Sequence, residues 1–78
     1  MAKFSVEAIV EPAPEGYKKE PDTDIIDYKL IRFTFYEGTP PEIRESLKTA
    51  IVWYIASQMS SGHMVNVGER YEFSRTIR

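Results

Sequence analysis

Apolar and polar side chains alternate near the start of the chain. Over residues 3–11 every second position is apolar, namely Phe4, Val6, Ala8 and Val10. Ile9 is the one apolar residue on the other parity. An alternation with a period of two is typical of a β-strand that buries one face. The pattern therefore predicts a first strand over residues 3–11.

A second apolar stretch, residues 25–37, is rich in aromatic and β-branched residues, which favour strands. The parity of its apolar positions changes midway, from Ile26, Tyr28 and Leu30 to Ile31, Phe33 and Phe35. A bulge near Leu30 and Ile31 would put both sets on one face. Alternatively, both faces of a single long strand are covered. We keep both explanations as hypotheses.

Residues 39–62 carry apolar side chains at helical spacing, with end signals on both sides. Thr39 is placed to be the N-cap, with two prolines in the first turn and Glu42 completing a capping box. Gly62 supplies the stop. One stripe of this predicted helix is the expected core face: Ile43, Leu47, Ala50, Ile51, Tyr54 and Ile55.

The second half of the helix is apolar nearly all round. Val52, Ala56 and Met59 fall opposite the core stripe, and Trp53 lies on a flank. A helix of this kind is usually buried on more than one side. Either a curled sheet or the long loop of the same chain covers Trp53 and Met59, or another subunit or partner does.

After the helix, residues 63–67 and 71–77 read as strand segments with a bend at Gly68, and we favour two short strands over one kinked strand. The whole predicts one α+β domain over residues 1–78. Its single helix packs across a small antiparallel sheet of three to four strands, in the order β-β-α-β or β-β-α-β-β.

Length and composition narrow the class of protein. A chain of 78 residues without cysteine has a small core and no disulfide to support it, so oligomerisation or partner binding is the common remaining support. The net charge of −2 argues against a generic nucleic-acid binder. With no apolar run long enough for a membrane span and no signal peptide, we expect a cytoplasmic protein.

Residues with catalytic or metal-binding chemistry are sparse. His63 is the only histidine, and its place near the helix end suits the negative end of the helix dipole. The serines have no apparent base, the glycines are isolated, and no zinc-type spacing occurs. We therefore expect a protein that is not an enzyme, with no catalytic residue, no metal site and no cofactor.

A protein-interaction module is the function that these features favour. Its predicted binding residues are Tyr17, Val52, Trp53, Ala56 and Met59. Tyr17 lies in the polar, proline-containing connection of residues 12–24, where an aromatic either folds back onto the core or anchors a partner. The partner is a second copy, giving a homodimer, or a larger protein that the chain inhibits or scaffolds, as small phage or bacterial regulators do.

Nucleic-acid binding through a sheet surface is the alternative. Aromatic and basic residues interleave along residues 28–36, and arginines on the last segment extend them. The residues in question are Tyr28, Lys29, Arg32, Tyr36, Arg70 and Arg75. The net negative charge and the expectation that Phe33 and Phe35 are core weigh against this alternative.

Overall fold

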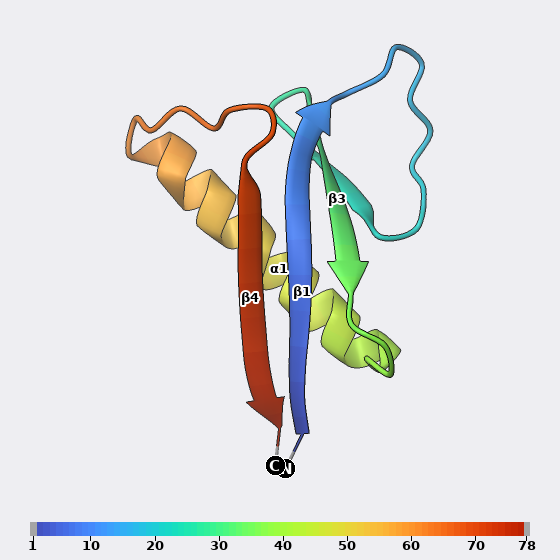
Figure 1. Ribbon diagram of the computed structural model, residues 1–78. Helices are drawn as coiled ribbons and strands as arrows, with labels where there is room; N and C mark the ends of the chain where they lie inside the picture. The colour runs from blue at the N-terminus through green and yellow to red at the C-terminus, as the bar shows by residue number, and fades with distance from the viewer. Residues whose placement is uncertain (1, 78) are drawn as a thin grey trace.

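The computed structural model describes residues 2–77 and places one helix on one face of a four-stranded antiparallel sheet (Figure 1). The elements are β1 (Ala2–Pro12), β2 (Thr23–Ile26), β3 (Lys29–Phe35), α1 (Pro41–Ser60) and β4 (Arg70–Ile77). The strands lie side by side in the order β2-β3-β1-β4. The predicted α+β fold is confirmed. Its element order is β-β-β-α-β, so three strands precede the helix instead of the predicted two, and one strand follows it.

The long second strand of the prediction is a hairpin of two strands. Asp27 and Tyr28 turn between them with φ of 49° and 63°, the left-handed values of a type I′ turn. This turn, and not a bulge, changes the parity, because β1 and β3 pair residue for residue from Val6 with Phe35 to Pro12 with Lys29. The second hypothesis, a strand covered on both faces, holds for the start of β3, where the neighbours Leu30 and Ile31 are both buried.

A single strand follows the helix, so the expected strand over residues 63–67 is wrong. Residues 63–69 form a connection in which Val65 is buried while Met64 and Val67 are exposed. Val65 packs into the core with side chains of the sheet, and the end of the connection is bonded to β1, where the Gly68 N–H donates to the Val10 carbonyl at 2.8 Å. It is therefore a connection, anchored by Val65, that leads into β4.

The two ends of the helix differ in how well the sequence predicted them. Thr39 is not the N-cap: Pro40 takes that position, and the buried Thr39 hydroxyl donates to the Tyr36 carbonyl at 2.6 Å. The predicted capping box is therefore wrong, because this hydroxyl closes the preceding turn. Gly62 does end the helix, with φ of 84° and its N–H bonded to the Met59 carbonyl at 3.0 Å.

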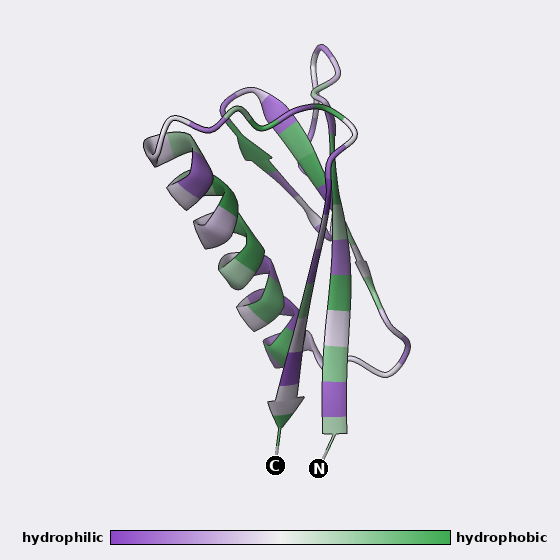
Figure 2. Ribbon diagram, turned by 60° about the vertical axis from the view of Figure 1, so that its left-hand side comes forward, coloured by the Kyte–Doolittle hydropathy of each residue, from purple (hydrophilic) through white to green (hydrophobic). Residues whose placement is uncertain are grey.

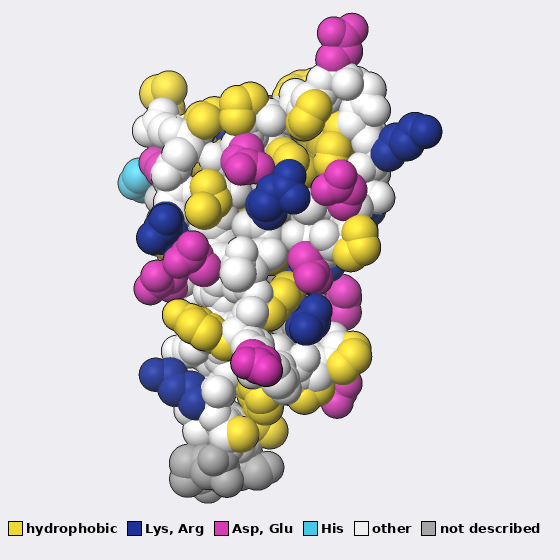
Figure 3. All heavy atoms as spheres, turned by 45° about the vertical axis from the view of Figure 1, so that its right-hand side comes forward, with side chains coloured by type: hydrophobic (Ala, Val, Ile, Leu, Met, Phe, Trp, Pro, Cys, Tyr) yellow, Lys and Arg dark blue, Asp and Glu magenta, His cyan; other side chains and the backbone are white. Residues whose placement is uncertain are grey.

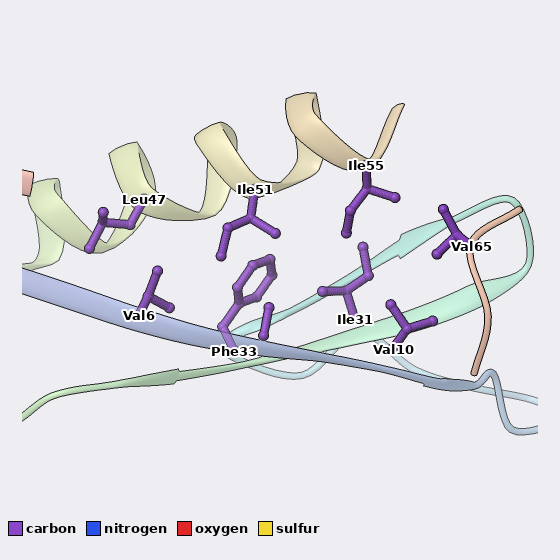
Figure 4. Close-up of a cluster of buried hydrophobic side chains, with 9 residues drawn as sticks. Val6, Val10, Ile31, Phe33, Leu47, Ile51, Ile55 and Val65 are labelled. Carbon is purple, nitrogen blue, oxygen red and sulfur yellow. The ribbon is translucent and has the colours of Figure 1, made fainter. Parts of the chain in front are cut away.

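The main core lies between the helix and the inner face of the sheet (Figure 4). Leu47, Ile51 and Ile55 point from α1 toward the strands, where they meet side chains of β1 and β3. The buried residues on the other side are Val6, Ala8, Val10, Ile31, Phe33 and Val65. The alternation of β1 and the helical stripe thus meet as the sequence predicts, except that Ala50 and Tyr54 lie outside this core.

A second buried site lies on the outer face of the sheet, opposite the helix. Leu30 points to this face, because its neighbour Ile31 points to the core, yet only 1% of its surface is exposed. Residues 13–22 lie over this region: the Tyr17 hydroxyl is hydrogen-bonded to Thr23, and the Glu20 carboxylate is 3.5 Å from Arg32. This connection, residues 13–22, is therefore part of the fold, and we call it the covering loop.

Candidate interaction surface

Trp53 is the predicted binding residue that the structure leaves most open to solvent. It lies in the second half of α1 with 73% of its surface exposed. Val52 and Met59 are half-buried and pack against the main core, and Ala56 is half-buried between them. The chain therefore uses two of the four predicted helix residues for its own core and leaves the indole uncovered.

A shallow polar groove of about 170 Å³ runs beside Trp53, between α1 and the edge of the sheet at β2. Besides Trp53 and Val52, it is lined by Lys19, Asp24, Glu45, Lys48 and Thr49. The charges are mixed, and Lys48 already pairs with Glu45 at 3.4 Å. An aromatic side chain bordered by mixed polar groups resembles the centre and rim of a protein interface.

Tyr17 is not part of this surface. Its hydroxyl contacts Thr23 and accepts the Glu20 N–H at 3.2 Å. Thr23 pairs with Arg32, whose side chain points away from the helix, so the tyrosine hydroxyl lies at the outer face of the sheet. Tyr17 therefore folds back onto its own chain, one of the two roles that its sequence context allows.

A second group of aromatic residues, which the sequence did not suggest as a site, lies at the free edge of β4. Tyr54 meets Tyr71 and Phe73 edge to face, with ring centroids 5.8 and 5.7 Å apart, and 44% of its surface is exposed. The helix crosses the sheet diagonally, and its C-terminal half extends beyond β4 (Figure 1). This crossing turns a residue of the predicted core stripe into a cover over a strand edge.

The Tyr71 hydroxyl donates a hydrogen bond to the Glu69 carboxylate within the same region. Burial of the phenol, together with this bond, raises the pKa of Tyr71 to about 12. The bond in turn lowers the pKa of Glu69. Both shifts favour the pair in which the tyrosine is protonated and the carboxylate charged, so the pair stabilises the fold at neutral pH.

Raising the pH is expected to weaken the fold through Tyr71. An unfolded tyrosine loses its proton near pH 10, whereas Tyr71 in the folded chain does so at about 12. Between these values the folded state binds more protons, so the free energy of unfolding falls as the pH rises. Urea denaturation of the parent and of Tyr71→Phe across this range measures the effect. An equal decline in the variant would contradict it.

The residues of the nucleic-acid alternative do not share one surface. Tyr28 and Tyr36 are exposed at opposite ends of β3. Arg32 is paired with Glu11 at 3.1 Å, and Arg70 with Glu7 at 3.6 Å, on the outer face. Lys29 lies 3.8 Å from Asp27, and Arg75 donates to Ser46 of the helix. Acidic and basic side chains alternate on the face shown in Figure 3.

Arg32 is paired with two carboxylates, those of Glu11 at 3.1 Å and Glu20 at 3.5 Å. Hydrogen bonding to Glu11, with a smaller contribution from Glu20, raises the pKa of this guanidinium. Its charge is thus already compensated within the chain. Arg32 therefore acts as a clamp between β1, β3 and the covering loop, and it offers little to a phosphate.

Groups that would support chemistry are scattered over the described part of the chain. Within residues 2–77 no three histidine, aspartate or glutamate side chains are arranged to hold a metal ion. His63 is exposed beside the helix end. Over the same residues, no helix combines the length and the hydropathy that a membrane-crossing helix requires. Comparison with known proteins found no matching family model, no matching curated protein and no matching solved structure.

Proposed function

We propose that this chain is a non-enzymatic protein-interaction module, which binds a larger protein through the outward side of α1 and inhibits or scaffolds it. The exposed indole of Trp53 carries the proposal. Tryptophan is among the residues that contribute most to protein interfaces, where it fills a pocket of the partner and loses little side-chain entropy.

The surroundings of Trp53 support the same proposal. The helix that carries it is anchored by Leu47, Ile51 and Ile55, so the indole is presented on a rigid element. The charged groove on one side supplies Lys19, Asp24 and Glu45 as polar contacts at the rim. Met59 packs against the core, so we assign it a structural role and leave it unchanged in the test.

Affinity capture tests the proposal. The parent chain, Trp53→Ala and Tyr36→Ala are immobilised and exposed to lysate of the native host, with and without nuclease treatment. Tyr36 is the matched control, because it is also an exposed aromatic but does not line the groove. We expect one protein to be retained by the parent and by Tyr36→Ala and to be lost with Trp53→Ala, while circular dichroism shows all three folded.

Fluorescence supplies the direct readout, because Trp53 is the only tryptophan of the chain. Adding the captured protein, in a tryptophan-free form, is expected to shift the Trp53 emission to shorter wavelength and to protect it from iodide. Capture that is equal for the parent and Trp53→Ala would contradict the assigned surface. Material that disappears with nuclease treatment would favour the nucleic-acid alternative.

A further inference from the structure

The free edge of β4 differs from the other edge of the sheet. β4 is eight residues long and pairs with β1 from Ala2 with Ile77 to Ile9 with Arg70, with no skipped residue and no proline. β2, at the opposite edge, has four residues, follows Pro21 and is flanked by the covering loop. Natural sheets protect exposed edges by shortening, prolines, bulges or charged side chains. β2 is short and preceded by a proline. β4 has neither proline nor bulge between residues 70 and 77; the bulge of Gly68 and Glu69 opposite Val10 lies before it, and its charged side chains are of mixed sign.

The hydrogen bonds at the end of β1 determine which groups of β4 are free. Val10 accepts from Gly68 and donates to the Glu69 carbonyl at 3.1 Å, so β1 bonds to β4 at every second residue from there. The Tyr36 N–H donates to the Ser5 carbonyl at 3.3 Å, so the backbone of Ser5 bonds on the β3 side of β1 and not to β4. This agrees with the alternation inferred from Val10. The backbone groups of four β4 residues therefore point outward: Arg70, Glu72, Ser74 and Thr76.

We infer that this edge pairs with the same edge of a second copy, giving a two-fold symmetric dimer with one continuous antiparallel sheet. The two-fold axis passes at Phe73. In this register Glu72 lies opposite Ser74 of the second copy, Arg70 opposite Thr76, and Tyr71 opposite Arg75. No like charges lie directly opposite each other, and each outward residue exchanges backbone hydrogen bonds with its partner.

The aromatic residues at the edge of β4 also favour a second copy of the chain as the partner of this edge. Tyr54, Tyr71 and Phe73 lie on the helix side of β4 and are only partly covered by their own chain. The C-terminal half of α1 extends beyond β4 (Figures 1 and 2), so a strand added to this edge would lie on the sheet beside the helix end. A second copy related by the axis adds its own β4 there, so the two aromatic groups cover each other.

The exposed area of the chain agrees with an interface of this size. The surface of 5526 Å² exceeds the value for a globular monomer of 9.0 kDa, about 4,900 Å², by about 600 Å². A standard interface buries about 800 Å² on each partner. The net charge of −2 adds little repulsion between two copies. Trp53 stays outside this contact, so the dimer presents two copies of the proposed binding surface.

Charge changes at Ser74 test both the dimer and its register. Ser74→Lys places a cation opposite Glu72 of the second copy, and Ser74→Glu places a second anion there. Because symmetry repeats the contact, we expect the dimer dissociation constant to fall about 2- to 30-fold for Ser74→Lys and to rise similarly for Ser74→Glu. Adding Glu72→Lys to Ser74→Glu places a cation at position 72 opposite the new anion at position 74 of the second copy, and is expected to restore the dimer. Sedimentation equilibrium over a range of concentrations gives each constant.

Two further results keep the test independent of folding. In the unaltered chain, the amides of Glu72 and Ser74 are expected to exchange slowly with solvent only at concentrations where the dimer forms. The amides of Tyr71 and Phe73, bonded to β1, exchange slowly at all concentrations. Ser74→Pro removes one outward N–H, and we expect it to weaken the dimer about 10- to 100-fold while Ser74→Ala does not.

Several outcomes would overturn the inference. A monomer at every concentration would exclude the dimer. Equal weakening by Ser74→Lys and Ser74→Glu would place Ser74, and not Phe73, on the axis, and no effect of either would place the contact elsewhere. These results are separate from the test of the proposed function, because Trp53→Ala is expected to lose the captured protein and keep the dimer.

Discussion

Replacing Ile51 with alanine is expected to remove most of the stability of this protein. Ile51 is fully buried at the centre of the core between α1 and the sheet. Truncating a buried isoleucine to alanine costs about 2–5 kcal/mol, because apolar contacts are lost and a cavity remains. A core in a chain of this size supplies about 3–5 kcal/mol in total. The variant should therefore be largely unfolded at room temperature, as far-UV circular dichroism would show.

Trp53→Ala is the matched control, two positions along the same helix. Its side chain is larger but mostly exposed, so the free energy of unfolding from urea titrations should change by no more than about 0.5 kcal/mol. Both variants are measured at concentrations where the chain is monomeric. A loss for Trp53→Ala as large as that for Ile51→Ala would mean that the chain itself covers the indole, which removes the basis of the proposed binding surface.

The parts of the fold that could be predicted are those in which local pattern and packing agree. The alternation of Val6, Ala8 and Val10 has one buried face and appears as such in β1. The helical spacing of Leu47, Ile51 and Ile55 likewise requires only that something apolar lie beneath it. In these elements the residues that the sequence places together are together in the core.

The hairpin between β2 and β3 could not be read in the same way. A two-residue turn of this type is usually marked by Asn-Gly or Asp-Gly, because both residues need positive φ. Here the second position is Tyr28, a bulky side chain in a conformation that favours glycine. Its aromatic ring suggested a strand, so the local signal was missing, and the pairing of Ile25 with Leu30 is what holds the turn.

The candidate site depended on how the helix crosses the sheet. The sequence placed Val52, Ala56 and Met59 opposite the core stripe of the helix and Trp53 on a flank. The diagonal crossing brings Val52 and Met59 down onto the sheet and leaves Trp53 outside. It also moves Tyr54 to the edge at β4. A crossing angle is set by contacts between distant segments, so the periodicity of one segment does not contain it.

The second large loss of stability is expected for Leu30→Ala, because Leu30 is buried beneath the covering loop. Leu30 is buried on the outer face, away from the main core, beneath the connection tied by Tyr17, Glu20 and Thr23. Its truncation is expected to cost about 2–5 kcal/mol. The loss falls first on the loop, so the peptide bonds after Lys18 and Lys19 should become at least about tenfold more sensitive to trypsin.

Ile25→Ala provides the control, because Ile25 lies opposite Leu30 on the same face but is 43% exposed. It should lose less stability and keep the loop closed. If the first tryptic cut in Leu30→Ala instead falls in the helix, at Arg44 or Lys48, then Leu30 supports the whole sheet and the loop is a passive cover. If it falls after Lys18 or Lys19, the loop and Leu30 form a second small core. A polar connection then stabilises this domain where cysteines are absent, because it buries one leucine that the helix cannot reach.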